Sequence, residues 1–412
     1  MRARLATLLV TPLAILAASC GADGEDASRR TLVVPEQYDT IQAAVDAARP
    51  GDLVLIEPGT YHEVVVVDTS SITIRGLDRN TVVLDGRDEL GNGIEITASG
   101  VAVENMTLTG YLFNGVMVNG ADGEYRPDGA GSVDGYRIDH VTTYNNGLYG
   151  IYAFASRNGT ISNSYASGHP DSGIYVGQCK PCNVVIHGVT AELNAIGYYG
   201  TNASGGVYVV ESTFRGNRLG IAPNSQDVER LAPQEETIVA GNLVVGDGAA
   251  AAPEIVQGFF GGGIAVGGGT SNTVVRNRVI GHDAYGIGLV ALGSYDPIGN
   301  RVEGNVLEDN HIDLLYAPDD PARATGNCFV GNAFRSSWPA DIETVMPCAA
   351  HGPGPDVTDP DLPGAPPAPD GPPPAPPRQP TMADPRVMLA GAAGAPDVPD
   401  VGAIAVPERP LR

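Results

Sequence analysis

A glycine followed by a β-branched or aromatic residue recurs along this chain at nearly constant spacing. Successive glycines are 22, 35, 23, 24, 23, 43 and 23 residues apart, so most steps equal one repeat and two carry an insertion. A period in the twenties predicts a solenoid, in which each repeat buries its apolar face against the next. The copies are Gly93-Ile94, Gly115-Val116, Gly150-Ile151, Gly173-Ile174, Gly197-Tyr198, Gly220-Ile221, Gly263-Ile264 and Gly286-Ile287.

Each repeat consists of short segments with period-two alternation, broken by Gly, Asn, Asp and Ser, with no helical stretch. This pattern excludes leucine-rich and helical repeats and predicts an all-β parallel β-helix of about 22 to 24 residues per coil. Asparagines fall between the Gly phrases and suit sharp bends, because Asn tolerates the left-handed conformation and its amide can bond to the next coil. These asparagines are Asn105, Asn163, Asn242, Asn277, Asn305 and Asn327.

The first predicted coils resemble those of a known superfamily. The segments Tyr38-Asp39-Thr40-Ile41-Gln42-Ala43-Ala44, Pro50-Gly51-Asp52-Leu53-Val54, Pro58-Gly59-Thr60-Tyr61 and Ile72-Thr73-Ile74-Arg75-Gly76 are similar to the opening of pectin-lyase-like proteins. The resemblance implies a right-handed parallel β-helix of about ten coils over residues 31–348. It does not specify an activity, because that superfamily includes lyases, hydrolases, esterases, epimerases and non-catalytic proteins.

The two ends of the chain differ from the repeats. Residues 1–20 have the charged start, short apolar stretch and small-residue end of an export signal, and residues 21–30 read as a linker. Cys20 follows the signal as in a bacterial lipobox, which predicts a lipid anchor in the cell envelope; a plain secretory signal with a chance cysteine is the alternative. Thr40–Ala48 is predicted to form an amphipathic helix that caps the first coil. Residues 349–412 are rich in Pro, Gly and Ala and predict a disordered tail.

Four further cysteines suggest two disulfides in an exported protein. We expect Cys179–Cys182, which flank a Lys-Pro turn, and Cys328–Cys348, which would tie the last coil to the segment that closes it. A redox dithiol at Cys179 and Cys182 is less favoured, because the first cysteine ends a strand rather than starting a helix. No second Cys or His pair has the spacing of zinc ligands, so we expect no metal and no cofactor.

The outward side chains of the strands after each glycine predict a binding surface. If Ile151 and Ile174 point inward, Tyr152, Tyr175 and Tyr199 point outward on neighbouring strands, about 4.8 Å apart. We expect these tyrosines to stack on sugar rings, because aromatic faces match the apolar side of a pyranose. The alternative is that they only stabilise the sheet. The remaining predicted site residues are Asn202, Arg218 and Asn224 for sugar hydroxyls, His169 as base and Asp171 as its acid or orienting partner.

The acidic charge limits the possible partners. The formal net charge of −24 argues against nucleic acid and against an anionic polysaccharide. The sequence therefore favours an exported protein that binds a polysaccharide or other glycan, touches the membrane only through its lipid, and leaves lyase, epimerase and hydrolase chemistry open. A non-catalytic β-helix scaffold or maturation factor of the cell envelope is the alternative. The insertion between Gly220 and Gly263, which contains Glu229, Glu235 and Glu236, could supply a carboxylate to the same face.

Overall fold

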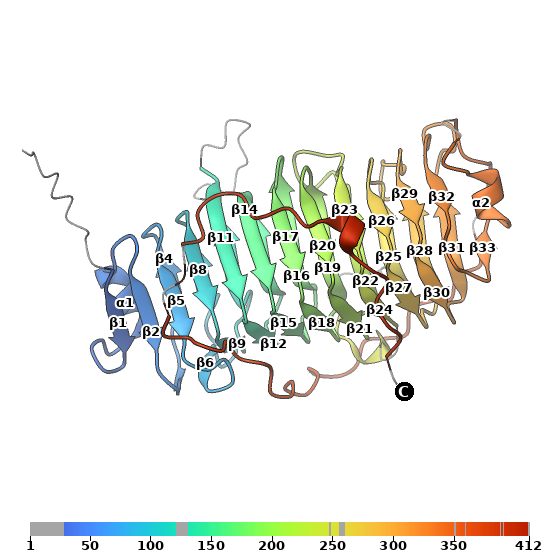
Figure 1. Ribbon diagram of the computed structural model, residues 1–412. Helices are drawn as coiled ribbons and strands as arrows, with labels where there is room; N and C mark the ends of the chain where they lie inside the picture. Colours follow the sequence, from blue (N-terminus) through green and yellow to red (C-terminus); the bar gives the residue numbers. More distant parts are fainter. Residues whose placement is uncertain are drawn as a thin grey trace, which may run out of the picture.

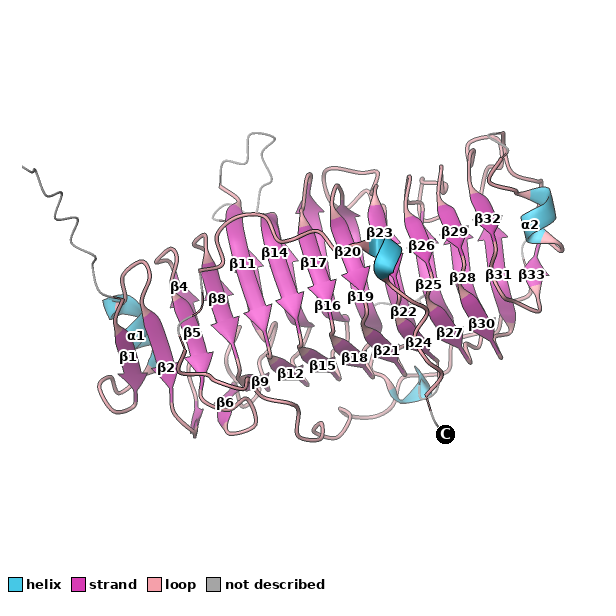
Figure 2. Cartoon of the chain, in the orientation of Figure 1, coloured by secondary structure: helices cyan, strands magenta, loops and turns pink. Residues whose placement is uncertain are grey.

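The chain forms a right-handed parallel β-helix in the computed structural model, which describes residues 29–120, 131–246, 249–254, 260–349, 352–358, 360–387, 389 and 391–410 (Figure 1). Three parallel sheets run along its length, and we call them sheets A, B and C. Each coil contributes one strand to sheet A, and this sheet has twelve strands, whereas we expected about ten coils. The difference arises because the first and last coils lie beyond the recurring Gly-apolar pairs. Figure 2 shows strands along the whole solenoid, with only short helical segments.

The strands of sheet A are β1 (Thr31–Val34), β2 (Leu53–Ile56), β5 (Thr73–Gly76), β8 (Val101–Glu104), β11 (Val133–Asp139), β14 (Ser156–Ser162), β17 (Val184–His187), β20 (Val207–Val210), β23 (Thr237–Ala240), β26 (Thr273–Val275), β29 (Arg301–Glu303) and β32 (Cys328–Val330). Those of sheet B are β3 (Gly59–Tyr61), β6 (Val82–Asp85), β9 (Thr107–Thr109), β12 (Thr142–Tyr144), β15 (Tyr165–Ser167), β18 (Thr190–Glu192), β21 (Thr213–Arg215), β24 (Leu243–Val245), β27 (Arg278–Ile280) and β30 (Val306–Glu308). Those of sheet C are β4 (Val65–Val67), β7 (Ile94–Ile96), β10 (Val116–Asn119), β13 (Tyr149–Phe154), β16 (Ser172–Cys179), β19 (Ile196–Ala203), β22 (Leu219–Asn224), β25 (Gly262–Gly267), β28 (Tyr285–Val290), β31 (Ile312–Ala317) and β33 (Ser337–Trp338).

The recurring glycines lie at the start of the sheet C strands, where neighbouring coils approach closely. A Cβ atom at Gly150 would lie 2.5 Å from the carbonyl oxygen of Gly173, and one at Gly220 would lie 2.4 Å from that of Gly263. Only glycine fits at such distances, which explains why a glycine recurs at this position of each coil. The residues that follow these glycines form one inward, fully buried row in the predicted register: Ile94, Val116, Ile151, Ile174, Tyr198, Ile221, Ile264 and Ile287.

Buried asparagines bond to one another from coil to coil, as the sequence predicted for part of the set. The Asn242 side chain donates to Asn277 and that of Asn277 to Asn305, both at 3.0 Å. Asn327 belongs to a second ladder, where it accepts from Asn300 at 2.9 Å. Asn105 and Asn163 lie outside both ladders, at left-handed bends with φ values of 58° and 48°.

The predicted cap and both predicted disulfides are confirmed. Helix α1 (Ile41–Ala47) lies at the N-terminal end of the solenoid, and the Thr40 hydroxyl accepts a hydrogen bond from the Ala43 amide at 3.1 Å (Figure 1). At the other end, α2 (Ile342–Val345) follows the last strands. The disulfides join Cys179 to Cys182 and Cys328 to Cys348. Two single-turn 3-10 helices, η1 (Ala249–Ala251) and η2 (Val401–Ala403), complete the regular structure.

The proline-rich end of the chain lies along the β-helix, contrary to our expectation of disorder. Residues 360–387 and 391–410, which we call the C-terminal strap, run toward the N-terminal coils and then return across the outside of sheet A (Figure 1). Buried or half-buried guanidinium groups hold it by donating to its backbone carbonyl oxygens. These bonds join Arg218 to Pro366, Arg79 to Pro380, Arg75 to Pro385 and Val387, Arg276 to Val401, and Arg278 to Pro407.

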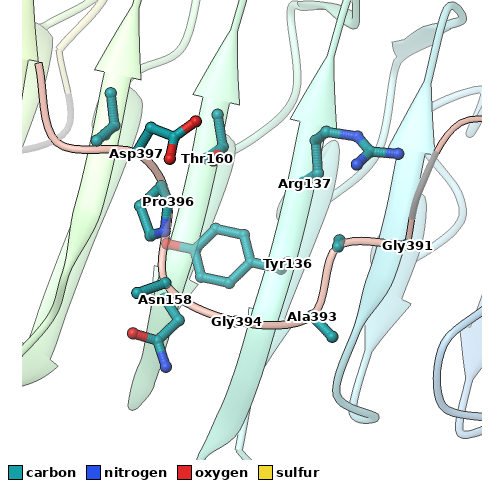
Figure 3. A pocket seen from close by; sticks show the side chains of 12 residues that line it. Tyr136, Arg137, Asn158, Thr160, Gly391, Ala393, Gly394, Pro396 and Asp397 are labelled. Carbon is teal, nitrogen blue, oxygen red and sulfur yellow. The ribbon is translucent and has the colours of Figure 1, made fainter.

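The prediction of a disordered C-terminal tail was wrong for a physical reason. A proline-rich segment cannot build a core of its own, but an extended chain leaves its carbonyl oxygens free, and each proline removes a donor that would need a partner. Arginine side chains of the solenoid satisfy those acceptors. Figure 3 shows the returning part of the strap, between Gly391 and Asp397, beside Tyr136, Arg137 and Asn158 of sheet A, where it leaves a groove of about 410 Å³.

Candidate functional site

The register of sheet C aligns the three predicted tyrosines. Tyr152 on β13, Tyr175 on β16 and Tyr199 on β19 are direct neighbours across the parallel strands. The rings of Tyr152 and Tyr175 stack with centroids 4.8 Å apart, and Tyr199 meets Tyr175 edge-on at 6.0 Å. The prediction of a continuous aromatic strip on the outer face is therefore confirmed.

The strip is wider than the sequence suggested, and only part of it is open. Tyr149 lies 4.9 Å from Tyr152, and Phe154 stacks on Tyr152 at 5.7 Å; we call these five rings the aromatic cluster. Tyr149, Tyr152 and Phe154 are half-buried, whereas Tyr175 and Tyr199 are 3% and 6% exposed. In this structure the last two rings have no free face for a sugar, so their predicted stacking role is not supported.

Tyr175 and Tyr199 are covered by residues 225–236, which we call the 225–236 loop. The Tyr175 hydroxyl donates to the Glu229 carboxylate, and the Gln226 side chain donates to the Tyr199 hydroxyl. Asn202 also fixes this loop, because its amide donates to the carbonyl oxygens of Gln226 at 2.8 Å and Glu229 at 3.2 Å. The insertion thus covers the predicted face and brings a carboxylate to it.

The two asparagines assigned to sugar hydroxyls are structural in this arrangement. Asn202 is fully buried under the 225–236 loop. Asn224 is 1% exposed, donates to the carbonyl oxygen of Ala222 at 3.0 Å and accepts from Gln226 at 3.1 Å. Both amides are used within the protein, so neither is available to a ligand on this face.

Two carboxyl groups border the aromatic cluster and have unusual proton affinities. Asp171 is 7% exposed and accepts from the Tyr149 hydroxyl; burial nevertheless raises its pKa to about 6. Burial also raises the pKa of Glu229 to about 7, although the Tyr175 hydroxyl favours its charged form. Each group can therefore hold or release a proton near neutral pH. One Asp171 oxygen, Oδ1, has no hydrogen-bond partner among the described residues.

The structure does not support His169 as the base. Its side chain is fully buried, with Nδ1 2.8 Å from Asn194 Oδ1 and Nε2 3.3 Å from Asn146 Nδ2. It belongs to an internal polar ladder that continues from Asn194 to Asn217. Burial lowers the pKa of His169 to about 4, so the imidazole is neutral and shielded from a surface ligand.

Arg218 is likewise a structural group rather than a ligand for sugar. It is fully buried, and its Nη2 lies 2.8 Å from the carbonyl oxygen of Pro366 and 2.9 Å from the Glu254 carboxylate. Its guanidinium also lies over the Phe260 ring, 5.2 Å from the centroid. Arg218 therefore anchors the C-terminal strap beside the start of β22.

These contacts place a wall at each end of the strands that carry the aromatic cluster. Arg218, just before β22, holds the strap, whereas Asn202 and Asn224, near the ends of β19 and β22, hold the 225–236 loop. Asp171 precedes β16 on the side of the strap, and Glu229 comes from the opposite loop. The aromatic cluster therefore has one protonatable carboxyl group on each side, Asp171 on the side of the strap and Glu229 on the side of the 225–236 loop.

Other site types receive little support from the described part of the chain. Within it, no three Cys, His, Asp or Glu side chains are grouped to hold a metal ion. No helix among the described residues is long and apolar enough to cross a bilayer. Cys20, with the rest of the predicted signal, lies outside the described residues.

Comparison with known proteins identifies the fold. The family model described as right-handed beta helix region matches residues 64–228. No curated protein sequence matches the chain significantly.

Several solved structures follow a similar chain course. The A-module of a mannuronan C-5 epimerase from Azotobacter vinelandii has 14% identity and a TM-score of 0.48, over 72% of this chain and 91% of that one. An alginate lyase from Paenibacillus sp. has 18% identity and a TM-score of 0.47, over 70% and 98%. A DFA-IIIase from Arthrobacter chlorophenolicus has 14% identity and a TM-score of 0.44, over 75% and 99%. Likeness at this level carries no argument about activity.

Proposed function

We propose that the protein binds a neutral glycan on the exposed part of the aromatic cluster, and that Asp171 and Glu229 act on it as an acid–base pair. The observation that carries this proposal is the meeting of half-buried aromatic rings with two carboxyl groups of raised pKa. Tyr149, Tyr152 and Phe154 offer the apolar surface that a sugar ring needs. The net charge of −24 disfavours an anionic chain.

Glycoside hydrolysis is the chemistry that this pair suits best. Such hydrolysis needs one protonated carboxyl group for the leaving oxygen and one ionised carboxylate that activates water or attacks the sugar. With a pKa of about 7, Glu229 can supply the proton, and Asp171, with a pKa of about 6, can be the carboxylate. Lyases and epimerases that act on uronates also need a cation to neutralise the sugar carboxylate. Arg218, which the sequence predicted as a ligand for sugar hydroxyls, cannot serve as that cation, because it is buried against Glu254.

A glycan-array screen with the full chain, followed by titration of the best hit, tests the binding proposal. We expect Tyr152→Ala to weaken binding by about 1 to 2 kcal/mol, or roughly 5- to 30-fold, because one aromatic platform is lost. Tyr208→Ala is the control, since Tyr208 is a half-buried tyrosine on sheet A. Equal losses in both variants, or no hit on the array, would contradict the proposed site.

A non-catalytic envelope scaffold is the second candidate function. It is favoured by the buried positions of Tyr175 and Tyr199 and by the use of Glu229 as an anchor for the 225–236 loop. Incubating the wild-type protein with its glycan hit and separating the products by chromatography distinguishes the two. Binding without any change in the glycan would favour the scaffold.

We also propose that the mature chain is held in the cell envelope by lipid on Cys20. The lipobox-like end of the predicted signal supports this proposal. We expect wild-type protein to partition with membranes and Cys20→Ala to be released in soluble form, as measured by fractionation and detergent phase separation. Membrane association that is unchanged in the variant would refute the anchor.

A further inference from the structure

We propose that a second cavity, beneath the C-terminal strap, binds the end of the glycan as a terminal sugar that is neutral or carries an amine. This inference rests on the proposed function and specifies its substrate class. The cavity measures about 680 Å³, within the usual range for small-ligand sites. Its walls come from the strap and from turns of four successive coils, at residues 85–88, 109–112, 144–147 and 168–170.

The strap forms a fixed wall of this cavity. It is anchored on one side by the bond from Arg218 to the Pro366 carbonyl oxygen, and on the other by the bond from Asn145 to that of Pro373, at 3.0 Å. The wall residues Ala368 to Pro372 lie between these two anchors. Because both ends of this short segment are held, the cavity exists without a ligand and needs little ordering on binding.

The charges that line the cavity select the ligand. Asp85 and Asp88 contribute carboxylates, and Arg87 is the single lysine or arginine among the lining residues. Glu254 also lines the cavity, but its carboxylate is paired with the buried guanidinium group of Arg218 at 2.9 Å. The unpaired lining is therefore richer in carboxylates than in cations, so a ligand must bring hydrogen-bond donors, either hydroxyl groups or an ammonium group. A sugar carboxylate would be repelled.

An aromatic side chain completes a lining suited to sugar. Tyr144, at the end of β12, is half-buried and lines the same cavity as the carboxylates. A tyrosine ring beside carboxylate acceptors offers one surface for the apolar face of a pyranose and another for its hydroxyl groups. An aliphatic ligand would leave the carboxylates without compensation.

The cavity begins next to the proposed reactive groups. Pro170 and Gly147 line it, and the chain continues directly to Asp171 on one coil and within two residues to Tyr149 on the other. The Asp171 amide donates to the carbonyl oxygen of Leu148 at 3.2 Å, which holds these two turns together. A glycan that lies on the aromatic cluster and passes Asp171 therefore reaches the cavity with its end.

Three monosaccharides with the same pyranose ring and different charges test this assignment: glucosamine, glucose and glucuronate. Each is titrated into the full chain at pH 6.5, and binding is measured by ligand-observed NMR. We expect affinity to fall in that order, by at least about 10-fold between the first and the last, because their charges are positive, zero and negative. Tyr144→Ala should weaken binding of glucosamine and glucose. Asp88→Asn should reduce the preference for glucosamine, and asparagine keeps the left-handed turn at this position, where φ is 55°.

Two controls separate this inference from the proposed function. Asp68→Asn removes an exposed carboxylate elsewhere and should change nothing. Tyr152→Ala should leave monosaccharide binding intact while weakening the longer glycan. Absence of monosaccharide binding, or binding unaffected by both cavity variants, overturns the cavity assignment even where the Tyr152 result upholds binding of the longer glycan on the aromatic cluster.

Discussion

Glu229→Gln is expected to lower the turnover of the glycan hit by about 10²- to 10⁴-fold while leaving its binding nearly unchanged. A positioned proton donor contributes a factor of this size, and a carboxamide cannot replace it. The carboxamide oxygen can still accept the hydrogen bond from Tyr175, so the 225–236 loop should stay in place. Single-turnover rates and separate binding titrations would distinguish the lost chemistry from lost affinity.

The pH dependence should identify the two carboxyl groups. The active form needs Asp171 ionised and Glu229 protonated, so activity should rise with pH through about 6 and fall through about 7. Asp171→Asn should remove the ascending limb along with most of the rate.

A control comes from the same loop. Glu235 is half-buried and pairs with Lys180 rather than with the aromatic cluster, so Glu235→Gln should keep the wild-type rate and pH profile. Wild-type turnover in Glu229→Gln, or an equal loss in Glu235→Gln, would show that the carboxyl group of Glu229 takes no part in the reaction. The loop would then act as a structural cover only.

Raised carboxyl pKa values also predict how folding stability changes with pH. A group whose pKa is higher in the folded protein stabilises the fold below its unfolded value and loses that contribution as the pH rises through the folded value. For Asp171 and Glu229 the loss falls between about pH 4 and 7. In the range of about pH 6 to 7, where the proposed chemistry needs Asp171 charged, Asp171 has therefore lost its stabilising contribution, which is typical of functional sites.

Periodicity predicted the parts of this protein that repeat. Once Ile151 and Ile174 are placed inward, alternation alone puts Tyr152 and Tyr175 on the outer face, and parallel pairing makes them neighbours. The capping helix and the disulfides were predictable for a similar reason, since each depends on residues close in sequence or at the end of the repeat.

Periodicity did not predict where the side chains point in the turns between strands. His169 and Arg218 lie in turns just before sheet C strands, where the alternation of a strand no longer applies, and both point into buried surroundings. The covering segments are also non-local. The position of Glu229 depends on how an insertion folds back, and that of the strap on arginines up to about 300 residues away in sequence.

The strap should be an integral part of the fold, and Arg75 offers the sharpest test. Its side chain is 1% exposed, with Nε 2.6 Å from Glu104, and its Nη1 donates to the carbonyl oxygens of Pro385 at 3.0 Å and Val387 at 2.6 Å. Glu104 is fully buried and has a second partner in Arg137, at 2.7 Å. Removing Arg75 thus leaves a buried carboxylate with half its compensation and two strap carbonyls without donors.

We expect Arg75→Met to lower the free energy of unfolding by about 3 kcal/mol, the lower end for breaking a buried ion pair, and to speed proteolysis of the strap near Val387. Arg157→Met is the matched control, because Arg157 pairs with Asp134 on the same sheet while the two side chains are 33% and 38% exposed; its loss should stay below about 1 kcal/mol. The double variant Arg75→Met with Glu104→Leu should recover part of the loss, since it removes the buried charge as well. Chemical denaturation measures the free energy of unfolding of these three variants. If Arg75→Met resembles Arg157→Met, the strap does not seal this part of sheet A.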